Sequence, residues 1–325
     1  MPYRNILEKI GNTPLVLITR LNPVKKVKVY AKLESFNPGG SVKDRIALSM
    51  IEAAEKAGDL TPDKVVLEAT SGNTGIGMAM VCAVKGYKCQ LVMPESASIE
   101  RRMIMEAYGA EILLTPAKKS TDGAIEQAYI MAREHPDRYF LTDQFNNDAN
   151  WQAHYRTTGP EIWRQTEGRI DAFICSVGTG GTLAGVSMAL KERNPKIVTA
   201  CADPDGSAIH SWIKTGELKA AGDSITEGIG QGRVTSNLEG APVDDAFNIP
   251  DTEALPVIFD LLREEGLCMG GSTGINLAGA VRLARQMGPG HRIVTILCDF
   301  GSRYQSKLFN PAFLKSKRLP FPDWL

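Results

Sequence analysis

Short apolar runs rich in β-branched residues alternate with longer amphipathic segments along most of the chain. Runs of the first kind predict strands, and apolar positions spaced three and four apart predict helices. Strands are expected at residues 27–34, 64–69, 88–93, 110–115, 171–177, 197–203 and 292–299. Helices are expected at residues 42–57, 73–85, 99–108, 121–134, 151–165, 181–193, 252–265 and 275–287. The alternation predicts an α/β protein in which crossover helices join parallel strands.

One long stretch does not follow this alternation. Residues 215–250 are rich in glycine and polar residues and have weak periodicity. A loop of this length inside a compact domain is usually functional, so we expect an irregular functional excursion here.

Composition narrows the class of partner. With 325 residues, 43% of them hydrophobic, the chain can bury a large core in two domains or one large one. Lys+Arg and Asp+Glu both number 37, so no net field draws the chain to nucleic acid or to an anionic membrane. A small-molecule substrate is therefore favoured.

Two further features concern the compartment and metals. The sequence has no leader peptide and no membrane-spanning run, which predicts a cytoplasmic protein. Its six scattered cysteines lack the spacing of a metal site, and we expect them to be buried, reduced thiols.

A glycine-rich turn at residues 37–42 places Lys43 in the first turn of a predicted helix. The helix dipole disfavours a cation there by about 0.3–1 kcal/mol and favours the neutral amine that forms a Schiff base. Lys43 is therefore a candidate nucleophile. The alternative is a solvated surface lysine, which is the commoner situation for this residue type.

A second turn, at residues 70–75, follows the strand expected at 64–69. Thr70, Ser71, Asn73 and Thr74 bring hydroxyl, carboxamide and backbone N–H donors to a helix start, an arrangement that suits an anion such as an α-carboxylate. An ordinary capped helix start is the alternative interpretation.

The third turn, Gly178-Thr179-Gly180-Gly181-Thr182, follows the strand expected at 171–177 and contains no acidic side chain. Its backbone amides can hold a phosphate. It matches neither a P-loop nor the GxGxxG dinucleotide fingerprint.

An amine, a carboxylate site and a phosphate site together indicate pyridoxal 5′-phosphate (PLP) and an amino-acid substrate. The chain resembles the cysteine synthase (O-acetylserine sulfhydrylase) and cystathionine β-synthase group of fold-type II PLP enzymes. The motifs that carry this resemblance occur in family order at residues 11–15, 37–45, 70–75, 158–163, 178–182 and 227–230.

The resemblance implies a role for each candidate residue. Lys43 would carry PLP through a Schiff base and remove the substrate Cα proton. The PLP 3′-oxygen would bond Asn73, and the pyridine nitrogen would meet Ser272, for which a simple turn serine is the alternative. The substrate carboxylate would be held by Thr70, Ser71, Asn73 and Thr74, with Gln144 closing over it and Gly228 lining the substrate pocket. The phosphate would be held by Gly178, Thr179, Gly180, Gly181 and Thr182.

The resemblance also implies an architecture and partners. The expected fold is two open, twisted, mostly parallel sheets flanked by helices, similar to the tryptophan synthase β chain. Residues 1–40 and 151–325 would form a large PLP-anchoring domain, and residues 41–150 a small mobile domain that binds the substrate carboxylate. A homodimer is implied, with serine acetyltransferase as a further possible partner.

The expected reaction is a β-replacement that makes L-cysteine from O-acetyl-L-serine and sulfide. Four departures from the cysteine synthase pattern, at residues 153–155, 203–207, 231–233 and 299–304, leave the second substrate open, and the first two resemble the cystathionine β-synthase version. An L-cysteine β-lyase that releases sulfide and a cystathionine β-synthase are the enzymatic alternatives. A catalytically silent partner of serine acetyltransferase is the non-enzymatic one. An inward Arg233 would favour an anionic second substrate, whereas an outward one is a solvated charge.

Overall fold

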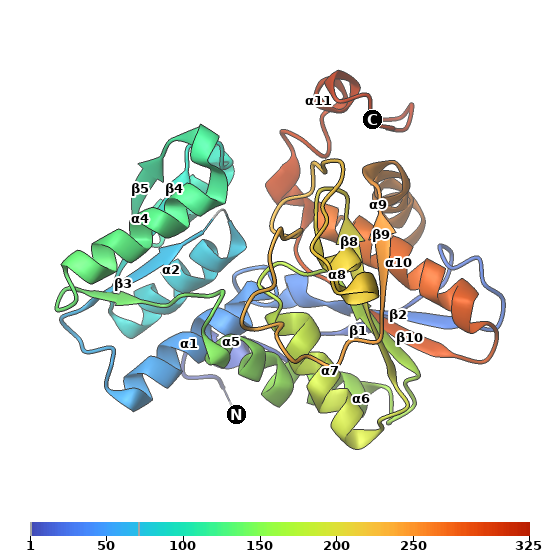
Figure 1. The fold of residues 1–325 in the computed structure, drawn as a ribbon, viewed down its shortest axis with the longest axis horizontal. Helices are drawn as coiled ribbons and strands as arrows, with labels where there is room; N and C mark the ends of the chain where they lie inside the picture. Colours follow the sequence, from blue (N-terminus) through green and yellow to red (C-terminus); the bar gives the residue numbers. More distant parts are fainter. Residues whose placement is uncertain (1, 71) are drawn as a thin grey trace. The chain divides into compact units, whose positions relative to one another are not determined.

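The computed structural model describes residues 2–70 and 72–325. The chain forms two compact units (Figure 1). Unit 1 comprises Met1–Gly11 and Asn37–Ala153, and unit 2 comprises Asn12–Phe36 and His154–Leu325. The first eleven residues thus belong to unit 1, although the sequence suggests the large domain. The physical reason is that Leu7 packs into the core of unit 1 and the Gly11 N–H donates to Asn37 Oδ1 at 2.8 Å.

Unit 1 is built on a four-stranded parallel sheet with the order β5-β4-β3-β6. The strands are β3 (Val65–Ala69), β4 (Lys88–Pro94), β5 (Glu111–Thr115) and β6 (Tyr139–Leu141). The helices are α1 (Lys43–Ala57), α2 (Asn73–Lys85), α3 (Ile99–Ala107), α4 (Ser120–Glu134) and α5 (Asp148–Ala153). Short 3₁₀ turns lie at Ile6–Lys9 and Ala117–Lys119.

The central strand β3 is buried along its whole length. Val66 faces the core that also contains residues of α1 and α2, whereas Val65, Leu67 and Ala69 face the core beneath α4. Because side chains alternate along a strand, Glu68 lies on the same face as Val66. A carboxylate therefore occupies a position that a parallel sheet normally fills with an apolar residue.

Unit 2 is built on a six-stranded sheet with the order β1-β2-β10-β7-β8-β9. Only β1 runs antiparallel to its neighbour. The strands are β1 (Leu15–Ile18), β2 (Lys28–Leu33), β7 (Ala172–Cys175), β8 (Val198–Pro204), β9 (Asp245–Ile249) and β10 (Arg292–Leu297). The helices are α6 (Gly159–Gln165), α7 (Gly181–Arg193), α8 (Ile209–Thr215), α9 (Asp251–Glu265), α10 (Gly271–Met287) and α11 (Pro311–Ser316), with 3₁₀ turns at Glu34–Phe36 and Gly301–Tyr304.

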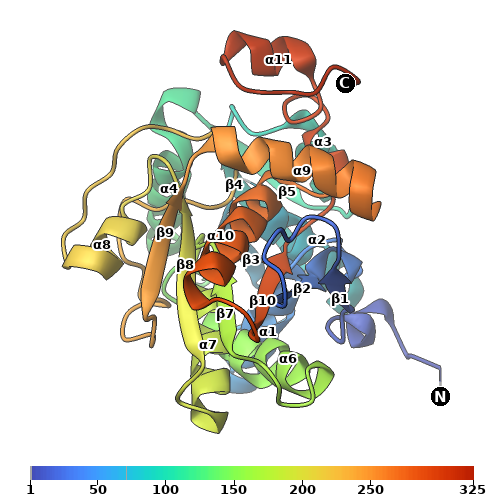
Figure 2. The ribbon, with the colours of Figure 1, turned by 90° about the vertical axis from the view of Figure 1, so that its right-hand side faces the viewer.

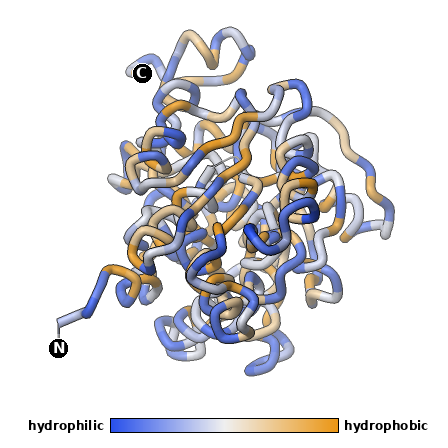
Figure 3. The backbone as a smooth tube through the Cα atoms, turned by 90° about the vertical axis from the view of Figure 1, so that its left-hand side faces the viewer, coloured by the Kyte–Doolittle hydropathy of each residue, from blue (hydrophilic) through white to orange (hydrophobic). Residues whose placement is uncertain are grey.

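Helices cover both faces of the sheet of unit 2 (Figure 2). Ala172 and Ile174 of β7 pack with α9 and α10, whereas Phe173 and Cys175 pack with α6 and α7. This alternation gives the doubly covered parallel sheet that continuous apolar strands predict. Figure 3 colours the backbone by hydropathy: hydrophobic segments lie inside, and many turns are hydrophilic.

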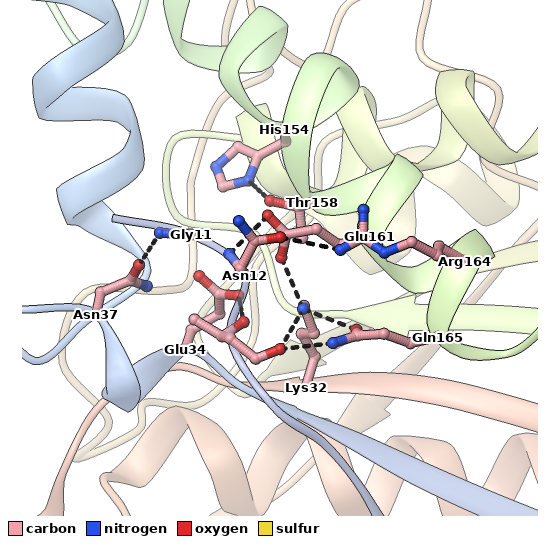
Figure 4. A network of polar contacts seen from close by, with 11 residues as sticks. Gly11, Asn12, Lys32, Glu34, Asn37, His154, Thr158, Glu161, Arg164 and Gln165 are labelled. Atoms are coloured by element: carbon pink, nitrogen blue, oxygen red, sulfur yellow. Dashed lines mark hydrogen bonds and ion pairs between the residues drawn. The ribbon is translucent and has the colours of Figure 1, made fainter. Parts of the chain in front are cut away.

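A buried ionic network fixes β2 to α6 within unit 2 (Figure 4). Lys32 Nζ lies 2.7 Å from Glu161 Oε2, and the two side chains are 0% and 6% exposed. Lys32 also donates to the Thr13 carbonyl at 2.7 Å and to Gln165 Oε1 at 2.9 Å. The 11–15 motif is thus tied to both elements.

The predicted α/β fold with two mostly parallel sheets is confirmed, and several details differ from the sequence prediction. Strands β1, β6 and β9 and helices α8 and α11 were not expected. Strand β6 has three residues and β1 four, which is too short for a periodic signal. Strand β9 lies in the stretch 215–250, so the end of that stretch is not a loop.

Two predicted helices also need correction. The segment expected as one helix at 151–165 consists of α5, a π-helical turn at His154–Thr158, and α6. Helix α10 begins at Gly271 rather than at residue 275. Its first turn contains two glycines, Gly271 and Gly274, which are poor helix formers and hide the helix start in the sequence.

Among the described residues, no helix is long and apolar enough to cross a membrane. The prediction of six buried cysteines is wrong for two of them: Cys268 is exposed and Cys298 is half-buried. Both lie outside the regular elements, Cys268 between α9 and α10 and Cys298 directly after β10. The described residues contain no cluster of His, Cys, Asp or Glu able to hold a metal ion.

Candidate active site

The candidate residues are divided between the two units. Unit 1 contains Lys43, Thr70, Asn73, Thr74 and Gln144, and unit 2 contains Gly178, Thr179, Gly180, Gly181, Thr182, Gly228 and Ser272. Ser71 lies outside the described residues. Each unit therefore carries its own set of polar groups.

Lys43 is the first residue of α1, and the turn before it is held by hydrogen bonds. Gly40 has φ of 79°, a left-handed conformation that favours glycine, and its N–H donates to the Asn37 carbonyl at 2.8 Å. The backbone N–H of Lys43 donates to Ser41 Oγ at 3.2 Å. Lys43 is half-buried, whereas a surface lysine of the alternative interpretation would be exposed.

Helix α2 packs closely on the start of α1. A Cβ on Gly77 would lie 3.2 Å from the Lys43 carbonyl oxygen and 3.1 Å from Ala47 Cβ, tighter than most real contacts. The absence of a side chain at Gly77 therefore lets the helix that follows the 70–75 turn lie against the lysine helix. In this way unit 1 holds the Schiff-base candidate and the anion-site candidate on adjacent helices.

Thr70 organises the turn that precedes α2. It is buried, and its Oγ1 accepts the Gly72 N–H at 3.1 Å and the Gly75 N–H at 3.2 Å. The hydroxyl thus satisfies two N–H groups of the helix start, as capping side chains do. Asn73 begins α2 immediately after this turn.

Thr74 and Gln144 are joined directly. Thr74 Oγ1 donates to Gln144 Oε1 at 2.6 Å, and both side chains are buried. Sequence positions seventy residues apart are therefore brought together at the carboxyl ends of β3 and β6. Ligands collect at this edge in open α/β sheets.

Glu68, which the sequence analysis did not single out, is hydrogen-bonded to Gln144. Its carboxylate accepts the backbone N–H of Gln144 at 3.1 Å and the Gln144 side-chain N–H at 3.3 Å, and it also bonds the Thr142 hydroxyl. The pKa of Glu68 is raised to about 7. Burial is the main cause and the nearby Asp143 charge acts in the same direction, whereas the bonds from Thr142 and Gln144 oppose the shift.

Arg101 of α3 was also missed. Its side chain is buried, and a Cβ on Gly72 would lie 2.9 Å from Arg101 Nε. The guanidinium therefore lies beside the 70–75 turn and adds a fixed positive charge to the anion-site candidate. No sequence signal distinguishes it from the adjacent Arg102.

In unit 2 the glycine-rich loop precedes α7, which begins at Gly181. Gly180 has φ of 86°, and the Thr179 carbonyl accepts from Thr235 Oγ1 at 2.8 Å. A Cβ on Gly178 would collide with the Gly228 carbonyl oxygen, so the loop around Gly228 lies against the phosphate-site candidate. Residues from the stretch 215–250 thus contact the predicted site within this unit.

His154, to which the sequence analysis gave no role in the site, contacts Thr182. The Thr182 hydroxyl lies 3.1 Å from His154 Nε2, and His154 Nδ1 lies 2.9 Å from Thr158 Oγ1. His154 and Thr158 are buried in the π-helical turn, a local geometry that is frequent at functional sites. The two contacts fix the imidazole and with it the threonine of the loop (Figure 4 shows the His154–Thr158 contact).

Ser272 lies in the first turn of α10 and is 5% exposed. Asn276, one turn later, accepts the Ser176 N–H at 2.6 Å and donates to the Ile296 carbonyl at 2.7 Å. These bonds anchor α10 to the segment after β7 and to β10. Ser272 is therefore held on a fixed helix start and is not the turn serine of the alternative interpretation.

The glycine-rich loop of unit 2 fits the phosphate group of PLP. The loop of unit 2 opens a helix of thirteen residues and carries no acidic side chain, as a phosphate site requires. The Ala184 N–H donates to the Gly180 carbonyl at 3.0 Å. The first N–H groups of a helix have no acceptor within the helix and can bind an anion.

Arg233 lies in unit 2 and is exposed. Its role toward the second substrate stays a prediction.

Comparisons with known proteins agree with this chemistry. Residues 6–299 match the family model described as pyridoxal-phosphate dependent enzyme. A relative named cysteine synthase 1, from Emericella nidulans, is 44% identical over 322 residues, which cover 97% of this chain and 86% of that protein.

Two solved structures are similar over nearly the whole chain. O-acetyl serine sulfhydrylase isoform 3 from Entamoeba histolytica has a TM-score of 0.89 and 38% identity, covering 95% of this chain and 92% of that one. A hydrogen sulfide-producing enzyme from Fusobacterium nucleatum has a TM-score of 0.86 and 38% identity, covering 93% of this chain and 100% of that one. On these matches and on the groups gathered in each unit, the chain belongs to the family of pyridoxal-phosphate dependent enzymes.

Proposed function

We propose that this enzyme is a cysteine synthase that forms L-cysteine from O-acetyl-L-serine and sulfide by β-replacement. The observation that carries the proposal lies in unit 1. There Lys43 starts one helix, and Gly77 lets the helix with Asn73 and Thr74 pack directly on it. The relatives named as cysteine synthases and O-acetyl serine sulfhydrylase support the same activity.

In this proposal unit 2 holds the cofactor. The backbone amides of residues 178–182 bind its phosphate, with Thr182 oriented by His154. Ser272 meets the pyridine nitrogen through a neutral hydroxyl. When bound, PLP supplies a ring that stabilises the negative charge developing at the substrate Cα.

Unit 1 supplies the amine and binds the amino acid. Lys43 would hold PLP and, once the amino group of the substrate has displaced its amine, would accept the proton from the substrate Cα. The substrate carboxylate is held by Thr70, Ser71, Asn73, Thr74 and Gln144, and the buried Arg101 adds positive charge beside them. Gly228, whose carbonyl lies against Gly178 of the phosphate loop, would line the substrate pocket.

Release of sulfide from L-cysteine is the second candidate. The similarity to the sulfide-producing enzyme of Fusobacterium nucleatum favours it, because that protein is covered completely by this chain. Arg233, which an inward orientation would bring to a carboxylate-bearing second substrate, is exposed and adds no support to this candidate.

We further propose a cytoplasmic homodimer that can bind serine acetyltransferase. The six free cysteines support a reducing compartment. Size-exclusion chromatography with light scattering, alone and with the acetyltransferase, tests both associations.

Replacing Lys43 tests the chemistry. Lys43→Ala should remove the visible absorption of lysine-bound PLP and lower turnover with O-acetyl-L-serine and sulfide by roughly a thousandfold or more. Lys56→Ala, at the exposed end of the same helix, is the matched control and should retain both. Borohydride reduction of the wild type followed by peptide mapping should place PLP on Lys43. A PLP adduct on another lysine would refute the assignment.

A further inference from the structure

The buried carboxylate of Glu68 belongs to a continuous chain of contacts that ends at the anion-site candidate. Glu68 is 1% exposed and lies next to the last residue of β3. It bonds Gln144 twice, and Gln144 Oε1 accepts from Thr74 at 2.6 Å. The Asn150 side chain donates to the Gln144 carbonyl at 2.7 Å and holds the segment from its other side.

The contacts leave one orientation for the carboxamide of Gln144. Its Nε2 donates to Glu68 Oε1 at 3.3 Å and to the Ala69 carbonyl at 2.9 Å, so both of its hydrogens have acceptors. Turning the amide over would set its oxygen against these two acceptors. The Gln144 oxygen therefore faces Thr74 and fixes the hydroxyl at the start of α2.

A buried carboxylate is unfavourable unless it is well bonded. Here the Ala69 N–H, the two Gln144 donors and the Thr142 hydroxyl all point to Glu68. Two of these four bonds come from Gln144. The Gln144 segment is thus the main element that this carboxylate orders.

We propose that Glu68 is a positioning residue that acts through Gln144 and Thr74 to set the affinity of the site for the substrate carboxylate. This inference rests on the proposed function, because it takes the 70–75 turn as the site of that carboxylate. Glu68 itself does not touch the reacting atoms. Its effect is confined to how well the carboxylate-binding groups are pre-arranged.

Glu68→Gln replaces one carboxylate oxygen, at the start of this series of contacts, by an amide nitrogen. If the new amide nitrogen replaces Oε2, Thr142 can rotate its hydroxyl to the Leu67 carbonyl, 3.3 Å away, and accept from the introduced amide. The backbone N–H of Gln144 then faces a donor and loses its acceptor. The opposite amide orientation leaves two N–H groups, of Ala69 and Gln144, without an acceptor. Either way the Gln144 segment is loosened.

The test compares two ligands on the holoenzyme by the change in cofactor absorption. L-alanine carries a carboxylate, whereas L-alaninamide has the same amine and side chain without the charge. Glu68→Gln should weaken L-alanine binding by about tenfold, as expected for a lost hydrogen bond of this kind, and L-alaninamide binding by less than about twofold. The KM for O-acetyl-L-serine should rise in parallel, with little change in kcat.

Two further variants keep the test decisive. Glu55→Gln removes a half-buried carboxylate of the same unit that bonds Lys85 and Tyr87, and should leave both ligands unaffected. Glu68→Asp keeps the charge but withdraws the oxygens from Gln144 by one methylene, and should also weaken L-alanine selectively. It serves as the test if Glu68→Gln does not fold.

Two outcomes would overturn the proposal, and a third would overturn the proposed function on which it rests. Unchanged L-alanine affinity in Glu68→Gln and Glu68→Asp would show that Glu68 does not act on the site. Equal weakening of both ligands would show a general distortion of the fold. A wild type that binds the two ligands equally would instead refute the carboxylate site of the proposed function.

Discussion

A single residue, Glu68, shows how a functional arrangement can oppose stability. An ordinary glutamate ionises near pH 4.3, but burial raises the pKa of Glu68 to about 7. The folded protein therefore binds this proton more tightly than the unfolded chain does. Between the two pKa values the unfolded chain is ionised first, so the free energy of unfolding falls as pH rises through this window.

Glu68→Gln lacks this titration, which yields a prediction about stability. The unfolding free energy of the variant minus that of the wild type should increase by about 3 kcal/mol between pH 4.5 and pH 7 and level off above about pH 8. Urea denaturation at several pH values, with Glu55→Gln as the reference, measures the difference. A difference that is flat across this range would contradict a buried, titrating Glu68.

At the scale of elements, the Lys32–Glu161 pair joins β2 to α6 in unit 2. The two charges are almost fully buried, so removing one leaves the other without compensation. Lys32→Met should lower the unfolding free energy by about 3–5 kcal/mol, as single-partner deletions of buried pairs do.

The double variant separates charge from packing. Lys32→Met combined with Glu161→Leu should be more stable than Lys32→Met alone, because no unpaired buried charge remains. Chemical denaturation of the wild type, the single and the double variant completes the comparison. If the second substitution lowers stability further, the pair is not held by mutual charge compensation.

For the whole molecule, the candidate residues that the sequence proposes are those with a local signature. Lys43, the 70–75 turn and the glycine loop at 178–182 each follow a strand and open a helix, so their place in the chain indicates their chemistry. The two sheets follow from apolar runs in the same way.

The residues that sequence missed act through contacts between distant segments. Glu68 reads as an interior position of a buried strand, and its role depends on Gln144, which the chain brings to it across β6. His154 matters because a π-helical turn directs it to Thr182. Neither relation has a periodic or local signal, and β9 was missed because it pairs with β8 from within a polar stretch.

The central claim is that this enzyme makes L-cysteine. Its most direct test is the steady-state kcat/KM of the wild-type holoenzyme for O-acetyl-L-serine with sulfide, measured beside that for L-cysteine alone, with L-serine plus homocysteine as a third assay. We predict that the first value is the largest and that the product is L-cysteine. A larger value for L-cysteine alone, with sulfide and pyruvate as products, would contradict the account and identify a sulfide-releasing lyase.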